Sequence, residues 1–108
     1  MSNPDLYAQV RRKLNVTWED DDTTARIEEI IASAIPFLKH KLGITGADFD
    51  FSVPGAENTL FLAYCLYEWN HAVSDFEENY HQMIADVTAQ WEVKSYLANS
   101  GGSGNAET

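Results

Sequence analysis

The sequence predicts an all-α fold, a small bundle of about four helices with a flexible or extended C-terminal tail. Two observations lead to this class. Apolar residues recur at steps of three and four along the longer segments, and helix-capping residue types stand where those segments begin and end. With 108 residues, of which 44% are hydrophobic, the chain fits one domain and can bury a core. We therefore expect a helical domain over residues 1–98 and a Gly/Ser-rich tail over residues 99–108.

The first helix is expected to begin at Asn3 and Pro4, because asparagine is a good N-cap and proline is tolerated in the first turn. It should end near Asn15. Residues 11–13 are all basic and would fall in its last turn, where cations complement the helix dipole.

The second helix is expected to follow the acidic run 19–22, since acidic residues favour a helix start. Gly43 should end it as a C-terminal glycine. Pro36 should kink or split it, because proline removes a backbone hydrogen bond inside a helix. The pattern has the clearest helical period of the chain, in a single stripe formed by Ile27, Ile30, Ile31, Ala34, Ile35, Leu38 and Leu42.

Residues 45–56 contain two glycines, a proline and two aspartates, which predicts a loop with room for one short extended stretch. Its phenylalanines would need cover from the core or from a neighbouring chain.

Residues 58–70 should form a third helix that is apolar almost all round. Such a helix is either central in its domain or shared between the core and a second interface. The second reading predicts a subunit interface at Tyr64, Tyr67, Trp69, Phe49 and Phe51.

Ser74 and Glu77 match a capping box and predict the start of a long last helix, nearly continuous with the third. Its core side would carry Phe76, Ile84 and Val87. The segment after residue 98 is rich in glycine and serine, a composition that is typical of a flexible chain.

The charge balance excludes several classes of protein. Seventeen acidic and seven basic residues give a formal net charge of −10. Such a chain is a poor ligand for nucleic-acid backbone, and an anionic membrane surface would repel it.

The longest apolar run falls far short of the roughly 20 residues that span a membrane, and the N-terminus lacks a signal-peptide pattern. An intracellular protein with a reduced Cys65 is expected.

No catalytic, cofactor or metal pattern stands out. Cys65 is the only cysteine, so an internal disulfide and a multi-cysteine zinc site are excluded. Cys65 and His71 would point about 120° apart on one helix and cannot form a dyad. The acidic run 19–22 lacks the alternating ligands and the central glycine of a calcium loop. Trp18, Trp69 and Trp91 are better core or interface anchors than a base-stacking set. These features favour an interaction protein without cofactors over an enzyme.

The order of the segments resembles the small head–tail connector (adaptor) proteins of tailed bacteriophages and prophages. The resemblance covers residues 6–97. The segments that carry it are Leu14-Asn15-Val16, Asp20-Asp21-Asp22, Ile27-Glu28-Glu29-Ile30-Ile31, the aromatic-rich residues 60–69, and Asp75-Phe76-Glu77-Glu78-Asn79-Tyr80.

The resemblance implies a structural virion protein without catalysis, assembled in the host cytoplasm and located in the neck of the particle. It would form a ring, typically of twelve copies, beneath the portal protein, and would extend the DNA exit channel. DNA would pass without tight binding, and the ring would offer a surface to the next tail-side connector or tail terminator protein. Its C-terminal region would contact the portal through Tyr96, Leu97 and Asn99. The alternative is a small acidic regulatory protein that mimics DNA and binds a basic protein.

Overall fold

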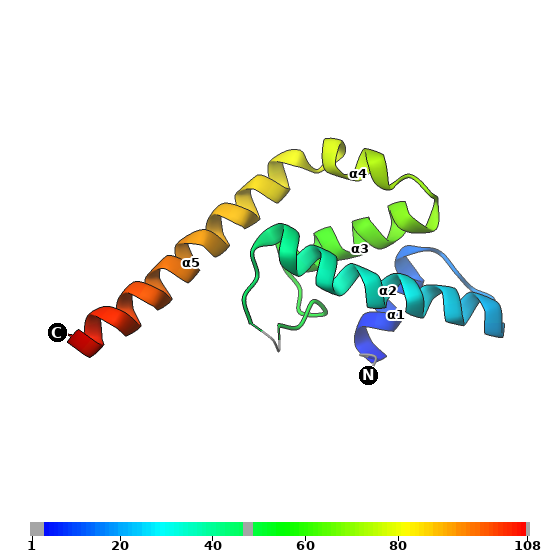
Figure 1. Ribbon diagram of the computed structural model, residues 1–108. Helices are drawn as coiled ribbons and strands as arrows, with labels where there is room; N and C mark the ends of the chain where they lie inside the picture. Colours follow the sequence, from blue (N-terminus) through cyan, green and yellow to red (C-terminus); the bar gives the residue numbers. More distant parts are fainter. Residues whose placement is uncertain (1–3, 47–48, 108) are drawn as a thin grey trace.

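The computed structural model describes residues 4–46 and 49–107, with only the backbone for Pro4 and residues 98–107. Within this part, regular secondary structure is helical throughout, which confirms the predicted all-α class. Asn3, the predicted first N-cap, lies outside the described residues. Figure 1 shows a body built from the first four helices, with the fifth extending away from it. The helices are α1 (Pro4–Lys13), α2 (Asp21–Leu42), α3 (Ala56–Trp69), α4 (Val73–Asn79) and α5 (His81–Glu107).

A capping side chain and a glycine determine where helix α2 begins and ends. The Asp20 side chain accepts a hydrogen bond of 2.7 Å from the backbone N–H of Thr23 and caps the helix. Gly43 ends it in the left-handed region, at φ 75°, where a residue with a Cβ is disfavoured. The helix continues through Pro36, so the predicted split is wrong. A proline removes only one backbone N–H. The fully buried Ala34 and Leu38 hold the helix on the core before and after Pro36.

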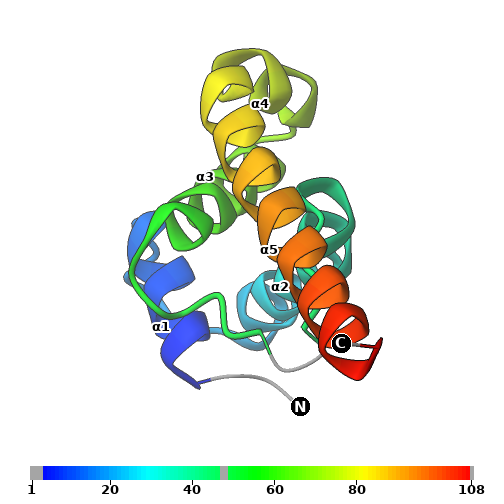
Figure 2. The ribbon, with the colours of Figure 1, turned by 90° about the vertical axis from the view of Figure 1, so that its left-hand side faces the viewer.

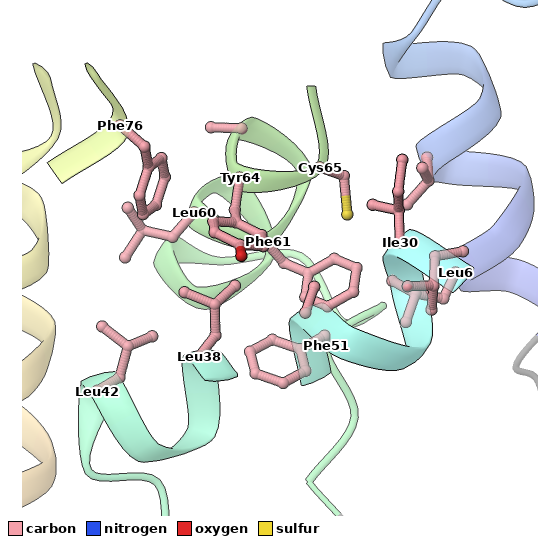
Figure 3. Close-up of a cluster of buried hydrophobic side chains, with 14 of the residues drawn as sticks. Leu6, Ile30, Leu38, Leu42, Phe51, Leu60, Phe61, Tyr64, Cys65 and Phe76 are labelled. Carbon is pink, nitrogen blue, oxygen red and sulfur yellow. The ribbon is translucent and has the colours of Figure 1, made fainter. Parts of the chain in front are cut away.

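Helix α3 lies at the centre of the domain and contacts each of the other four helices. This explains much of its apolar composition, because most of its apolar side chains face protein, whereas Thr59 is exposed and Leu62 is half-buried. Figure 3 shows its Leu60 and Phe61 between side chains from α2 and from the 43–55 loop. The Phe51 ring stacks on the Phe61 ring, with their centroids 4.8 Å apart. Within its own chain α3 is thus a central helix, and a subunit interface on its remaining surface stays a prediction.

The path from α3 to α5 differs from the predicted near-continuous helix. The chain reverses after α3, with His71 in the left-handed region at φ 57°, and runs back as α4 (Figure 1). A second break at Tyr80 separates α4 from α5. Ala72 occupies the N-cap of α4 without a side-chain hydrogen bond. Ser74 therefore lies inside the first turn, and the predicted capping box is wrong. Both turns allow Phe76 to lie in the core, where its side chain is fully buried.

Helix α5 gives the molecule its elongated shape. The radius of gyration is 16.0 Å and the extents are 58 × 30 × 19 Å, whereas a compact chain of this length has a radius of about 13 Å. Ile84 and Val87 are buried on the body, and Trp91 Nε1 donates to Glu57 Oε2 at 2.9 Å. Figure 1 shows the C-terminal part of α5 extending away from the body, and in Figure 2 this part lies in front of the body, toward the viewer.

The C-terminal segment is helical in backbone as far as Glu107, where the sequence predicts a flexible or extended tail. Local propensity does not account for this path, because the segment holds three glycines and glycine is a weak helix former.

Candidate interaction surface

The described residues hold no cluster of three or more His, Cys, Asp or Glu side chains able to bind a metal ion. Over the same residues, no helix has both the length and the apolar character to cross a membrane. Burial, and secondly the Glu68 carboxylate, raise the pKa of Cys65 to about 12. Since the thiolate is the nucleophile, Cys65 is unreactive at neutral pH. In the structure it is a small apolar side chain of the core.

The five residues predicted as a subunit interface all contact other parts of their own chain. Phe51 and Tyr64 are only 2% and 7% exposed. The Phe51 ring stacks on Phe61 of α3, and the Tyr64 ring meets Phe76 of α4 edge-on. For these two residues the interface prediction is corrected, since their side chains belong to the core. The cover that the phenylalanines of the loop required comes from this chain.

Tyr67, Trp69 and Phe49 are half-buried and lie at the edge of the core. Asn79 Nδ2 donates to the Tyr67 hydroxyl at 2.8 Å. The Arg26 guanidinium lies over the Trp69 ring, 4.4 Å from its centroid. The Phe49 ring meets the Trp91 ring edge-on at 5.5 Å. Each ring therefore has a structural role within the chain and offers only part of its surface to a partner.

The projecting part of α5 carries the main exposed apolar group of the described residues. Val93, Tyr96 and Leu97 are 55%, 69% and 59% exposed. Their spacing of three and four places them on one side of the helix, and we call them the α5 stripe. Tyr96 and Leu97 were predicted as contact residues and are exposed as such a role requires. The side chain of Asn99 lies outside the described residues.

Val93 was missed at the sequence level, although the signal was present. It stands three and four residues before Tyr96 and Leu97, the spacing of one helix face. Other large apolar side chains with substantial exposure, such as Trp18 and Val53, occur singly. Single exposed apolar residues are normal on protein surfaces, whereas grouped ones indicate a contact.

A polar hollow of about 400 Å³ lies between α2 and α3; we call it the α2–α3 hollow. Arg26 Nη2 donates to the Trp69 carbonyl oxygen at 2.8 Å and lies 3.3 Å from His71 Nε2. A hydrogen bond to Glu68 contributes, after burial, to the raised pKa of Tyr64. Glu68 lies in the last turn of α3, and His71 lies beyond the end of that helix. The hollow is lined by Arg26, Glu29, Ile30, Ser33, Glu68 and His71.

No protein-family model matches the chain, and neither a curated protein nor a solved structure does so. The features of this chain that bear on its function are therefore those of its own surface, above all the α5 stripe and the distribution of charge.

Proposed function

We propose that this protein is a structural connector of a phage neck, which assembles as a ring beneath the portal protein and extends the DNA exit channel. The observation that carries the proposal is the α5 stripe, an exposed apolar group on a helix that leaves the body. A projecting amphipathic helix fits a hydrophobic groove of a partner, with anchors spaced like Val93, Tyr96 and Leu97. In this proposal the groove belongs to the portal.

Tyr96 would be the main anchor. Tyrosine is enriched at the energetic centres of interfaces, and it supplies a large apolar ring with a polar hydroxyl. The ring is two-thirds exposed, so most of its surface is available to a partner. Leu97 and Val93 flank it on the same side of α5 and would exclude water from the contact.

The charge distribution supports a channel through which DNA moves freely. A net charge of −10 repels phosphate, and tight binding needs several Lys or Arg residues in contact with the backbone. We expect no retardation of duplex DNA in a gel shift at physiological salt. Binding that weakens steeply as salt rises would contradict the channel.

The portal contact is tested by co-sedimentation of the full chain with the portal protein of the same phage. The double substitution Tyr96→Asp/Leu97→Asp should abolish co-sedimentation, because it buries charge in an apolar groove. The matched control Ser74→Asp/Ala85→Asp adds the same charge at exposed sites away from the stripe and should bind normally. Equal binding by both variants would contradict the proposed contact.

An acidic regulatory protein that mimics DNA remains the second candidate, because one face of α2 is acidic and exposed at Asp21, Asp22, Glu28 and Glu29. The two functions differ in assembly. A connector forms large rings, visible by negative-stain microscopy alone or with the portal. A DNA mimic stays monomeric or dimeric with the portal present and binds a basic protein instead.

A further inference from the structure

Two of the seven basic side chains have no partner among the described residues. Of the seven basic residues, Arg11 pairs with Glu19 at 3.1 Å and Lys41 with Glu77 at 2.7 Å. Arg26 and Lys94 lie over tryptophan rings, and Lys39 also makes an interaction. Within the part of the chain that the structure describes, Arg12 and Lys13 are exposed and make no ion pair or hydrogen bond. We call these two residues the basic end of α1.

The surface around the basic end of α1 is hollowed on both sides. Arg12 and Lys13 border a hollow of about 420 Å³ together with Gln9, Asn58 and Leu62. Arg12 also borders a second hollow, of about 250 Å³, against Tyr7, Ala8 and Val16. The helix dipole accounts for cations in a last turn. The dipole does not explain why these two cations remain unpaired beside hollows, in a chain whose acidic residues outnumber its basic residues by ten. This surface suits a rigid element that carries carboxylates.

The same chain presents such an element. Asp21, Asp22, Glu28 and Glu29 are exposed, and among the described residues none of these four side chains has an ion-pair or hydrogen-bond partner. A spacing of seven residues returns to nearly the same side of a helix, about 10.5 Å further along it. One face of α2 therefore carries two neighbouring pairs of carboxylates, which we call the α2 acidic face.

We propose that the basic end of α1 in one copy binds the α2 acidic face of the next copy. This inference rests on the proposed ring and names the contact that would build it. Arg12 and Lys13 would pair with Glu28 and Glu29, two adjacent cations against two adjacent carboxylates. The pairing gives the unpartnered cations of α1 their counterpart on a second copy of the same chain.

The positions of the two surfaces make the contact directional. The basic end of α1 borders the hollow between α1 and α3, whereas Glu29 borders the α2–α3 hollow. The surfaces lie against different sides of α3, so one copy can bind a neighbour through each of them. A head-to-tail contact of this kind repeats, and it closes into a ring when its rotation allows. Repulsion between acidic copies is screened beyond about 8 Å at physiological salt, which leaves the local pairs to decide the contact.

Charge reversal and rescue test the contact, with the assembled mass of the full chain measured by sedimentation velocity. Arg12→Glu/Lys13→Glu and Glu28→Lys/Glu29→Lys should each raise the concentration for half-assembly by about tenfold or more, a shift of roughly 1.4 kcal/mol. The variant with all four changes should assemble as the wild type does. All four sites are exposed, and circular dichroism verifies that each variant is helical.

Failure of the contact and failure of the ring give different results. If the wild type forms rings and both reversals form them equally well, the contact is wrong and the ring stands. If the variant with all four changes stays as impaired as the two reversals, the α2 acidic face is not the counterpart. If the wild type forms no assembly with or without the portal, the ring itself is wrong, and the contact falls with it.

A second measurement uses the unmodified sequence and does not depend on folding of a variant. Wild-type protein is prepared with natural and with heavy nitrogen, mixed, and treated with a carbodiimide, which joins an amine directly to a carboxylate. Peptides that join Lys13 to Glu28 or Glu29 should carry one light and one heavy partner. Lys13 joined only to carboxylates outside α2, or only within one chain, would overturn the pairing.

Discussion

Phe51 ties the long loop between α2 and α3 to the core, and its removal should be among the most damaging single changes in the chain. Its ring is 2% exposed. It stacks on Phe61 with centroids 4.8 Å apart and meets the Phe49 ring edge-on at 5.0 Å. Phe51→Ala would remove the ring from both contacts and leave a cavity beside α3.

The magnitude follows from two terms. Burial of a whole phenylalanine side chain is worth about 1.5–3 kcal/mol. A cavity adds about 24 cal/mol for each Å³ that neighbouring groups fail to fill, so a residual volume of about 50 Å³ adds roughly 1 kcal/mol. We expect a loss of about 2.5–4 kcal/mol from the two terms together. This is a large part of the 5–15 kcal/mol that stabilises a typical domain.

Urea unfolding followed by circular dichroism measures this loss, and Phe37→Ala is the matched control. The Phe37 ring also stacks on an aromatic neighbour, Tyr64, at 4.9 Å, but it is 36% exposed. Its removal should cost about 1 kcal/mol, the worth of a partly solvated aromatic pair. Equal losses for the two variants, or a loss below about 1 kcal/mol for Phe51→Ala, would refute the burial argument.

Three further predictions concern single positions. Asp20→Ala should cost about 0.5–2 kcal/mol through loss of the α2 cap, whereas Ser74→Ala should cost under about 0.5 kcal/mol; urea unfolding compares them. Gly43→Ala should lower the melting temperature, because a Cβ at φ +75° is strained by about 1–2 kcal/mol while the nearest outside atom, Trp91 Cβ, is 3.9 Å away. The pKa of Cys65 is raised by burial from 9.0 to about 12, so between these values the folded state binds more protons than the unfolded state. Stability should therefore fall as pH rises through that window, by at most about 1.4 kcal/mol per pH unit, and Cys65→Ala should flatten the fall.

Local chemistry was enough to predict much of the N-terminal half. The stripe from Ile27 to Leu42, the acidic start and Gly43 each act over a few residues, and the structure confirms a helix with those ends. Two predictions were wrong because they used signals that act over only a few residues. Pro36 signals a break that packing on both sides overrides. Ser74 and Glu77 form a capping pattern that the structure does not use, because the N-cap is Ala72 and the helix begins at Val73, two residues earlier than a Ser74 cap requires.

The surface was harder to predict than the core. An apolar helix at 60–69 indicates burial but not what buries it, and only the fold shows that α3 contacts each of the other four helices. The exposed side of α5 after Trp91 follows from the direction in which the helix leaves the body. That direction depends on the turns at His71 and Tyr80, where residues distant in sequence compete for the core.

The sequence by itself determined the helical class, the ends of α2, the acidic charge and the lack of a recognisable catalytic motif, since these depend on composition and on neighbours within a few positions. Only the tertiary structure decided that Phe51 and Tyr64 are internal, that Val93, Tyr96 and Leu97 are exposed together, and that Arg12 and Lys13 lack partners within the part of the chain that the structure describes. Burial and pairing are properties of groups brought together by folding, and a single pattern along the chain does not record which groups will meet.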